Sequence, residues 1–298
     1  MTAIIEARGL TRKFGDFTAV DHVDFTIEEN QIHGLLGRNG AGKTTIMQLL
    51  TGQDFASAGE ASIFGESPVE NPRVLSNVSF IKESQKYPDS FRPRHVLAAA
   101  PLFYANWSQE LADELVAEFR LPVNRDIKKL SRGQLSSLGV IVGLASRAPI
   151  TFFDEPYLGL DAVARQLFYD RLLDDFAEHP RTVILSTHLI DEVSNLLEHV
   201  IVVDQGTILL DADTEELRGR ASTVVGPASA VAAFTAGRDI VHTDGIGGLS
   251  SVTVMGALTT GERDAAFAAG LEIAPVSLQQ LIVRLTSIDT PAASSERN

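Results

Sequence analysis

The amino-acid sequence predicts an α/β protein with a central parallel sheet and a second, smaller α+β module at its C-terminal end. Apolar strands alternate with helical stretches along much of the chain, which is typical of parallel strands joined by crossover helices. An apolar strand at 32–36 leads into a glycine-rich loop at 37–42 and a helix at 43–50. Further strands are predicted at 150–153, 183–185 and 200–203.

Two regions of different character are predicted around this sheet. Residues 4–27 alternate apolar and polar side chains and contain a Gly-Asp turn at 15–16, so antiparallel strands are expected there. Residues 85–148 instead space their apolar side chains at helical intervals, as at Leu111 and Leu115. We therefore expect an antiparallel β-subdomain and a helical subdomain in addition to the parallel core.

The C-terminal part of the chain has its own pattern. After Leu217 the composition shifts towards Ala, Gly, Thr and Val, and residues through Ser222 are predicted to join two domains. Strand and helix patterns then follow in the order β-α-β-β-α-β, with a last helix at 278–285, which predicts a ferredoxin-like module. The polar end is expected to be disordered. The predicted domains are 1–217 and 223–287, with a tail at 288–298.

Composition excludes several classes of function. The chain of 298 residues has 25 basic and 39 acidic side chains and a net charge of −14, so a nucleic-acid partner is not expected. It has no cysteine, which removes thiol chemistry, disulfides and cysteine-bound metals. No apolar run reaches the roughly 18 residues that a bilayer span needs, and no secretory signal is visible. We expect a cytosolic protein that meets a membrane only through a partner.

The strongest motif is the segment 37–44, Gly-Arg-Asn-Gly-Ala-Gly-Lys-Thr, which matches the phosphate-binding pattern G-x-x-x-x-G-K-[ST]. Glycines let the backbone approach an anion closely, and the following helix directs its N–H groups at the anion. Lys43 is expected to reach the β- and γ-phosphates, and the Thr44 hydroxyl to ligate Mg²⁺. The other nucleotide contacts are predicted at Gly37, Asn39, Gly40, Ala41, Gly42 and Thr45.

Two adjacent carboxylates, Asp154 and Glu155, end the apolar strand at 150–153. Beside a phosphate-binding loop, two adjacent carboxylates at a strand end can have different chemical roles. We expect Asp154 to hold Mg²⁺ through water, and Glu155 to act as the general base that polarises the attacking water.

Two further motifs complete a familiar order. Leu-Ser-Arg-Gly-Gln at 130–134 precedes the acids, and Ser-Thr-His at 186–188 follows them. Over residues 1–215 this order resembles the ATP-binding cassette (ABC) ATPases. The resemblance implies a P-loop NTPase core with an antiparallel β-subdomain and a helical subdomain. In it, 130–134 would be the signature motif, 159–161 the D-loop and His188 the switch histidine that contacts the γ-phosphate and orients Glu155.

The signature motif has a physical rationale as a second anion site. Ser131 is a typical N-cap residue, and the Gly133 N–H belongs to the same helix N-terminus. In the resembled family this helix end faces a γ-phosphate held by another subunit, with Gln134 and Asp161 in the same interface. The resemblance therefore implies ATP and Mg²⁺ as ligands and a second copy of the chain as a partner. It also implies that Phe14 stacks on adenine, with Phe17 as the competing candidate.

The sequence departs from the family pattern at three positions. Glu83 stands where the family's Q-loop has Gln, and Gln85 follows two residues later, so either is a candidate to sense Mg²⁺. Arg132 replaces a signature glycine, and Leu158 replaces a small polar residue. None of these changes removes a group that the chemistry needs, so hydrolysis is expected.

The predicted function is the ATP-hydrolysing subunit of an ABC transporter, peripheral on the inner face of the cell membrane and bound to integral membrane permease subunits. The segment 276–281 resembles the end of the ATPases of ABC-2-type exporters, which favours export. The permease is expected to contact a groove near the Q-loop, lined by Tyr87, Pro88, Phe91 and Phe103. Two alternatives remain: a cassette ATPase that acts on nucleic acid or ribosomes, and a regulatory cassette that senses nucleotide without turnover.

Overall fold

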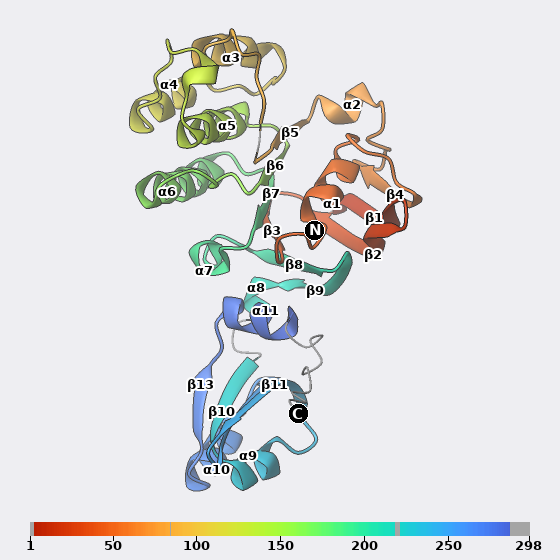
Figure 1. The fold of residues 1–298 in the computed structure, drawn as a ribbon, viewed down its shortest axis with the longest axis vertical. Coiled ribbons are helices and arrows are strands. Elements are labelled where there is room, and N and C mark those ends of the chain that lie inside the picture. Colours follow the sequence, from red (N-terminus) through yellow and green to blue (C-terminus); the bar gives the residue numbers. More distant parts are fainter. Residues whose placement is uncertain (1–2, 84, 218–220, 287–298) are drawn as a thin grey trace, which may run out of the picture. The chain divides into compact units, whose positions relative to one another are not determined.

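The computed structural model describes residues 3–83, 85–217 and 221–286 (Figure 1). The predicted tail at 288–298 and part of the predicted junction lie outside these residues. By its internal contacts the chain forms two compact units. The first comprises residues 1–188 and 195–211, and the second comprises residues 189–194 and 212–298.

A six-stranded sheet is the centre of the first unit, with the strand order β5-β6-β7-β3-β8-β9. The pairs β5/β6, β6/β7, β3/β7 and β3/β8 are parallel, which confirms the predicted α/β core. Parallel neighbours end at the same edge, so the segments that follow β3, β6 and β7 lie close together. The strands are β3 (Ile32–Leu36), β5 (Val78–Ile81), β6 (Ile150–Asp154), β7 (Thr182–Thr187), β8 (His199–Asp204) and β9 (Thr207–Asp213).

An antiparallel sheet with the order β2-β1-β4 forms the predicted β-subdomain. Its strands are β1 (Ala3–Phe14), β2 (Phe17–Glu28) and β4 (Ala58–Ile63), and the last of these was not predicted. Helix α1 (Lys43–Leu50) joins the two sheets, because its fully buried Ile46 and Met47 share one apolar core with side chains of both. This packing fixes where the N-terminus of α1 lies.

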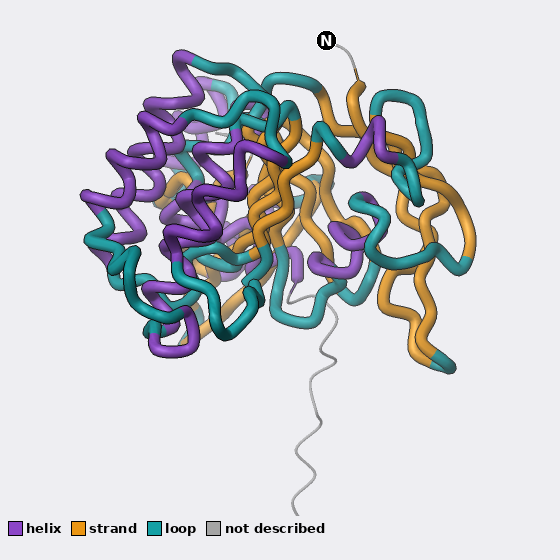
Figure 2. Tube along the Cα trace, turned by 90° about the horizontal axis from the view of Figure 1, so that it is seen from above, coloured by secondary structure: helices purple, strands orange, loops and turns teal. Residues whose placement is uncertain are grey.

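Helices α3, α4, α5 and α6 lie on one side of the parallel sheet, whereas α1 and α2 lie on the other side with the antiparallel strands (Figures 1 and 2). Helix α5 packs against β5 and β6 through Gly143, where an added Cβ would lie 2.5 Å from the Phe153 ring. The helical elements are α2 (Pro72–Leu75), α3 (Pro93–Ala99), η1 (Ala100–Leu102), α4 (Gln109–Glu118), η2 (Ile127–Lys129), α5 (Arg132–Ser146) and α6 (Ala162–Glu178).

The second unit is built on a four-stranded antiparallel sheet with the order β11-β12-β10-β13. Together with its helices this is the β-α-β-β-α-β arrangement that the sequence predicted. Its core includes Val224, Val254 and Ala266. The elements are α7 (Ile190–Val193), α8 (Thr214–Leu217), β10 (Ala221–Pro227), α9 (Ala228–Thr235), β11 (Asp239–Ile246), β12 (Leu249–Met255), α10 (Thr260–Ala268), β13 (Glu272–Pro275) and α11 (Leu278–Thr286).

The two units differ from the predicted domains in two ways. The first unit ends at residue 211 rather than at 217, and residues 189–194 belong to the second unit. The second difference concerns the start of the C-terminal module. Strand β10 begins at Ala221, and both Ala221 and Ser222 pair with β12 and are buried. The small side chains of this segment indicated a linker, but they are small because the segment packs inside a sheet. Among the described residues, no helix combines the length and the apolar character that a membrane crossing requires.

Packing at Gly143 generates a stability prediction. Replacing Gly143 with Ala would force a methyl group against Phe153 and Ile81, and this overpacking is expected to lower the free energy of unfolding by about 1–3 kcal/mol. The matched control is Gly261→Ala in α10, where an added Cβ meets nothing within 4 Å. The control should not lose stability, because Ala favours a helix over Gly. Urea unfolding followed by circular dichroism measures both; equal stability of the two variants would contradict the packing argument.

Candidate active site

A cavity of about 640 Å³ in the first unit collects most of the residues predicted to bind nucleotide. It lies where the phosphate-binding loop, the Q-loop and the segment after β6 approach one another. The predicted residues that line it are Phe14, Asn39, Gly40, Gly42, Lys43, Thr44, Thr45, Glu83 and Glu155. Ala19, Arg132 and Leu158 also line it, although none of them was predicted as a site residue, and so does the competing aromatic candidate, Phe17.

The loop at 37–42 depends on glycine for its path. Gly37 and Gly42 have φ angles of 152° and 110°, and an added Cβ would lie 2.2 Å from the Val203 carbonyl oxygen or 2.6 Å from that of Ala19, respectively. Gly42 is the N-cap of α1, and no side chain caps this helix. The first N–H groups of α1 therefore lack a side-chain partner and are suited to a phosphate. Gly37 and Ala41 are buried and shape the loop without lining the cavity.

Lys43 is buried at the start of α1. Its Nζ donates to the Gly37 carbonyl oxygen at 2.9 Å and to that of Arg38 at 3.1 Å, so the side chain folds back over the loop. Nζ also lies 3.3 Å from Glu155 Oε1. The predicted phosphate-binding cation and the predicted base thus form a buried ion pair.

Thr44 and Asp154 fit a magnesium site. The Thr44 hydroxyl donates to Asp154 Oδ2 at 2.8 Å, and the Ser186 hydroxyl donates to Asp154 Oδ1 at 2.7 Å. A hydroxyl and a carboxylate beside a phosphate-binding loop are the oxygen donors that Mg²⁺ takes in nucleotide sites. Ser186 holds Asp154 from the neighbouring strand β7, a contact that the sequence did not identify.

Glu155 lies just past the end of β6 with a φ of 46°, a left-handed conformation that is unfavourable for a residue with a side chain. The Glu155 N–H donates to both the carbonyl oxygen and the hydroxyl of Ser186, at 3.3 and 3.2 Å, which holds the strained backbone in place. The carboxylate contacts Lys43 through Oε1 and His188 Nδ1 through Oε2, the latter at 2.9 Å. The structure therefore brings together the two residues that the sequence assigned to catalysis.

Tyr157 was missed by the sequence analysis. Its hydroxyl lies 3.2 Å from Glu155 Oε2 and 3.1 Å from His188 Nδ1, and its side chain is buried. Burial raises the pKa of this phenol above its ordinary value, and the neighbouring Glu155 carboxylate acts in the same direction. No sequence pattern marks this position, because the contact depends on β7 lying beside β6.

The signature motif lies at the surface and does not line the cavity, with the exception of Arg132. Ser131 is the N-cap of α5, as predicted: its Oγ accepts from the Gln134 N–H at 3.2 Å, and Gln134 Oε1 accepts from the Ser131 N–H at 3.1 Å. An added Cβ at Gly133 would lie 2.5 Å from the Gly159 carbonyl oxygen, so only glycine fits against the D-loop. Asp161 is exposed and caps α6 through the Ala164 N–H.

Two candidate aromatic side chains lie at the cavity rim. Phe14 is 48% exposed and Phe17 is 64% exposed. The Arg12 guanidinium lies 4.4 Å from the centre of the Phe14 ring, a cation–π arrangement that orients this ring.

Glu83 pairs with Arg132. The Arg132 Nη2 donates to Glu83 Oε1 at 2.7 Å, and both side chains are exposed. The two departures from the family pattern are therefore neighbours in space. The carboxylate of Glu83 lies on the cavity wall, whereas Gln85 does not line the cavity.

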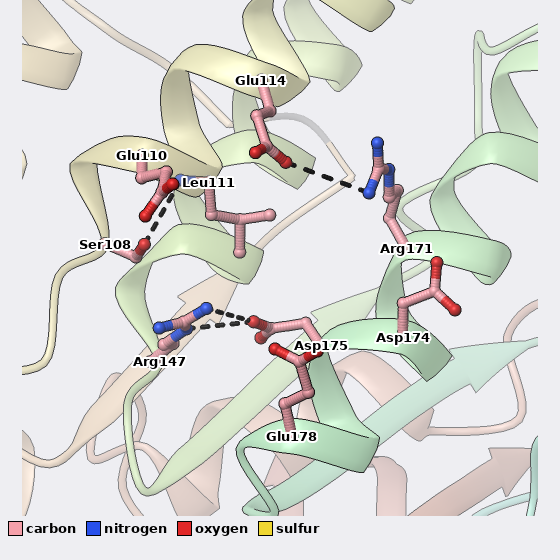
Figure 3. A pocket seen from close by; sticks show the side chains of 9 residues that line it. All are labelled: Ser108, Glu110, Leu111, Glu114, Arg147, Arg171, Asp174, Asp175 and Glu178. Carbon is pink, nitrogen blue, oxygen red and sulfur yellow. Dashed lines mark hydrogen bonds and ion pairs between the residues drawn. The ribbon is translucent and has the colours of Figure 1, made fainter.

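A second cavity, of about 310 Å³, lies between α4, the end of α5 and α6. Figure 3 shows that Arg147 faces Asp175 and that Arg171 faces Glu114 across it. Asp175 is buried and also pairs with Arg181 at 2.7 Å. These ion pairs join residues of different segments, which indicates that the cavity is bordered by a structural ion-pair cluster.

Comparison with known proteins agrees with this geometry. The sequence profile described as "ABC transporter" matches residues 20–158. The chain is 30% identical to the Nod factor export ATP-binding protein I of Cupriavidus metallidurans, over 73% of each protein. It is 28% identical to the bacitracin transport ATP-binding protein BcrA of Bacillus licheniformis, over 74% of this chain and 73% of the relative. The ABC transporter ATP-binding protein YtrB of Bacillus subtilis is 26% identical, over 72% of this chain and 74% of the relative.

Solved structures share the fold. An ATP-binding subunit of an ABC transporter superposes with a TM-score of 0.64 at 21% identity, over 72% of this chain and 91% of that chain. A dimeric ATP-binding cassette in a post-hydrolysis state, bound to ADP and Pi, superposes with a TM-score of 0.61 at 20% identity, over 70% of this chain and 98% of that chain.

The position of Lys43 generates a binding prediction. Lys43→Ala should weaken ATP binding by about 100-fold or more, because it removes charge-assisted hydrogen bonds to the phosphates. The matched control is Lys128→Ala, which removes an exposed lysine outside the cavity. Titration with a fluorescent ATP analogue measures both affinities. An unchanged affinity in Lys43→Ala would contradict the assignment of the loop.

Proposed function

The chain belongs to the ABC transporter family as an ATP-binding and ATP-hydrolysing subunit, and on this basis we propose that two copies of it enclose two ATP molecules and drive a separate membrane permease. The observation that carries this proposal is the separation of two phosphate-binding helix ends within one chain. The N-terminus of α1 lies in the cavity, whereas Ser131 and Gly133 at the N-terminus of α5 lie at the surface outside it.

The helix end at Ser131 is suited to a phosphate from a second copy. Ser131 and Arg132 are exposed and Gly133 is partly exposed, and a helix N-terminus favours an anion. A head-to-tail pair with two-fold symmetry would give each γ-phosphate donors from both copies. ATP would then close the dimer, since each triphosphate gains contacts that neither copy supplies alone. Hydrolysis and phosphate release would remove those contacts and reopen it.

The residues around the cavity have distinct roles in this proposal. Lys43 binds the β- and γ-phosphates, for which its Nζ must exchange the Gly37 and Arg38 carbonyl oxygens for phosphate oxygens. Glu155 accepts a proton from the attacking water as general base, and His188 orients Glu155 through the contact at Oε2. When Lys43 contacts the phosphates, it no longer pairs with Glu155 Oε1. Substrate binding therefore makes the carboxylate of the proposed base accessible to water.

Thr44 and Asp154 would hold Mg²⁺, because their oxygen atoms already lie together beside the loop. When bound, the ion would neutralise part of the charge that develops on the phosphate oxygens. Glu83 is the second candidate ligand, since its carboxylate lines the cavity. It must leave Arg132 to serve in this way.

The permease contact is proposed near the Q-loop and the helical subdomain. Phe91 and Phe103, which the sequence assigned to this surface, are 39% and 70% exposed, and the neighbouring Leu102 is 83% exposed. Exposed apolar side chains of this size favour a partner helix. The contact would place the chain at the inner face of the membrane. The name of the Nod factor relative includes export, which favours export as the direction.

Glu155→Gln tests the hydrolytic role. The amide cannot take a proton from water, so ATP should still bind while turnover falls by about 100-fold or more. The trapped ATP state should accumulate as a dimer in size-exclusion chromatography. The control is Glu110→Gln, an exposed acid beside the second cavity, which should retain its turnover. Turnover of Glu155→Gln at the wild-type rate would remove Glu155 as the base.

Ser131→Arg tests the role of the signature motif across the dimer. A bulky cation at this helix end should block ATP-dependent dimerisation in the Glu155→Gln background but leave ATP binding to the monomer intact. Ser108→Arg is the matched control, because Ser108 caps α4 by the same kind of hydrogen bond. Both variants lose an N-cap hydrogen bond worth about 1 kcal/mol, so the loss of a cap alone would not account for a difference in dimerisation between them. Normal dimerisation of Ser131→Arg would refute the proposed contact.

A further inference from the structure

We propose that Tyr157 is a positioning residue for hydrolysis, because its hydroxyl joins the Glu155 carboxylate to the end of β7 that carries His188. This inference rests on the roles proposed above for Glu155 and His188. The Tyr157 side chain contacts both the proposed base and the proposed switch residue, and within the part of the chain that the structure describes it makes no hydrogen bond to the phosphate-binding loop.

The hydrogen bonds around the Tyr157 hydroxyl assign its proton. The Thr187 hydroxyl donates to the phenolic oxygen at 3.0 Å, and the His188 N–H donates to it at 3.2 Å. These two donors fill the accepting capacity of the oxygen. The single phenolic proton is therefore left for Glu155 Oε2, at 3.2 Å, or for His188 Nδ1, at 3.1 Å. Only Glu155 can accept it when His188 Nδ1 carries its own hydrogen.

The same pattern assigns the tautomer of His188. An ionised carboxylate only accepts hydrogen bonds, so the 2.9 Å contact between His188 Nδ1 and Glu155 Oε2 requires the hydrogen on Nδ1. This leaves Nε2 as the ring atom available to a substrate. Tyr157 thus supports the arrangement in which the base and the histidine share one oxygen atom.

Tyr157 is itself held rigidly. Its side chain is 2% exposed, and its ring meets the His188 ring edge to face at 5.8 Å between centroids. Its carbonyl oxygen accepts from the Leu160 N–H at 2.9 Å, so the backbone is also fixed. Burial raises the pKa of the Tyr157 phenol above its ordinary value, which favours the protonated hydroxyl that can donate. A rigid donor of this kind limits the positions that the Glu155 carboxylate can take.

The test is Tyr157→Phe, which keeps the ring and removes only the hydroxyl. We expect kcat for ATP to fall about 10- to 100-fold, because small displacements of a base have effects of this size. The KM and Kd for ATP should change by less than about twofold, since no contact with the nucleotide is lost. The matched control is Tyr104→Phe, which removes a hydroxyl that accepts from Ser79 Oγ at 3.3 Å outside the cavity. The control should keep wild-type kcat and KM.

Three outcomes would overturn the inference: wild-type kcat in Tyr157→Phe, an equal loss of kcat in Tyr104→Phe, or a loss confined to ATP affinity. Comparison with Glu155→Gln distinguishes a failure of the positioning role of Tyr157 from a failure of the proposed base, Glu155. If kcat is reduced in Glu155→Gln but is at the wild-type level in Tyr157→Phe, only the positioning role is refuted. If kcat of Glu155→Gln is at the wild-type level, the proposed base is refuted, and the positioning role is refuted with it.

A measurement on the unmodified protein tests the network even if Tyr157→Phe does not fold. Nitrogen NMR of the histidine side chains, with the His188 signals identified by their loss in His188→Gln, reports which ring nitrogen is protonated. We expect a proton on Nδ1 of His188 in the nucleotide-free protein. An unprotonated Nδ1 would contradict the assigned hydrogen bonds and overturn the inference.

Discussion

The buried contact between Lys43 and Glu155 is the interaction on which the rest of the site depends. It joins the start of α1 to the end of β6, which are far apart in the sequence, across 3.3 Å. Two buried charges are tolerated only when each offsets the cost of removing the other from water. Before substrate binds, each therefore holds the other in place. In the proposed function, phosphates would replace Glu155 as the partner of Lys43, and this single exchange would couple substrate binding to release of the base.

The parallel sheet creates this contact. Strands β3, β6 and β7 are neighbours, and the loop after β3, the acids after β6 and the polar segment at the end of β7 therefore meet at one edge. Ser186 is paired with Asp154 across the β6/β7 register, which is why its hydroxyl reaches the Asp154 carboxylate. The antiparallel β-subdomain adds the aromatic rim through Phe14 and Phe17. The helical subdomain adds the surface helix end at Ser131.

Three residues at this edge adopt backbone conformations with positive φ that their surroundings hold in place. Glu155 adopts a left-handed backbone conformation, and its N–H is held by Ser186 from the adjacent strand. Gly37 and Gly42 adopt positive φ values where a side chain would meet a carbonyl oxygen. These positions are the ones that present a carboxylate and a set of N–H groups to the cavity. Strands β3, β6 and β7 are buried along their whole length, so their packing can stabilise the strained residues.

The sequence by itself determined the parts whose signal is local. Alternating apolar patterns specify strands and helices, and the spacing of 37–44 specifies a loop that approaches phosphate, because glycine and lysine act there through their own backbone and side chain. The order of motifs also indicated the family. Only the tertiary structure decided which side chains meet across strands: Ser186 with Asp154, Tyr157 with Glu155 and His188, and Arg132 with Glu83. These contacts depend on strand order, register and helix packing, which no short stretch of sequence encodes.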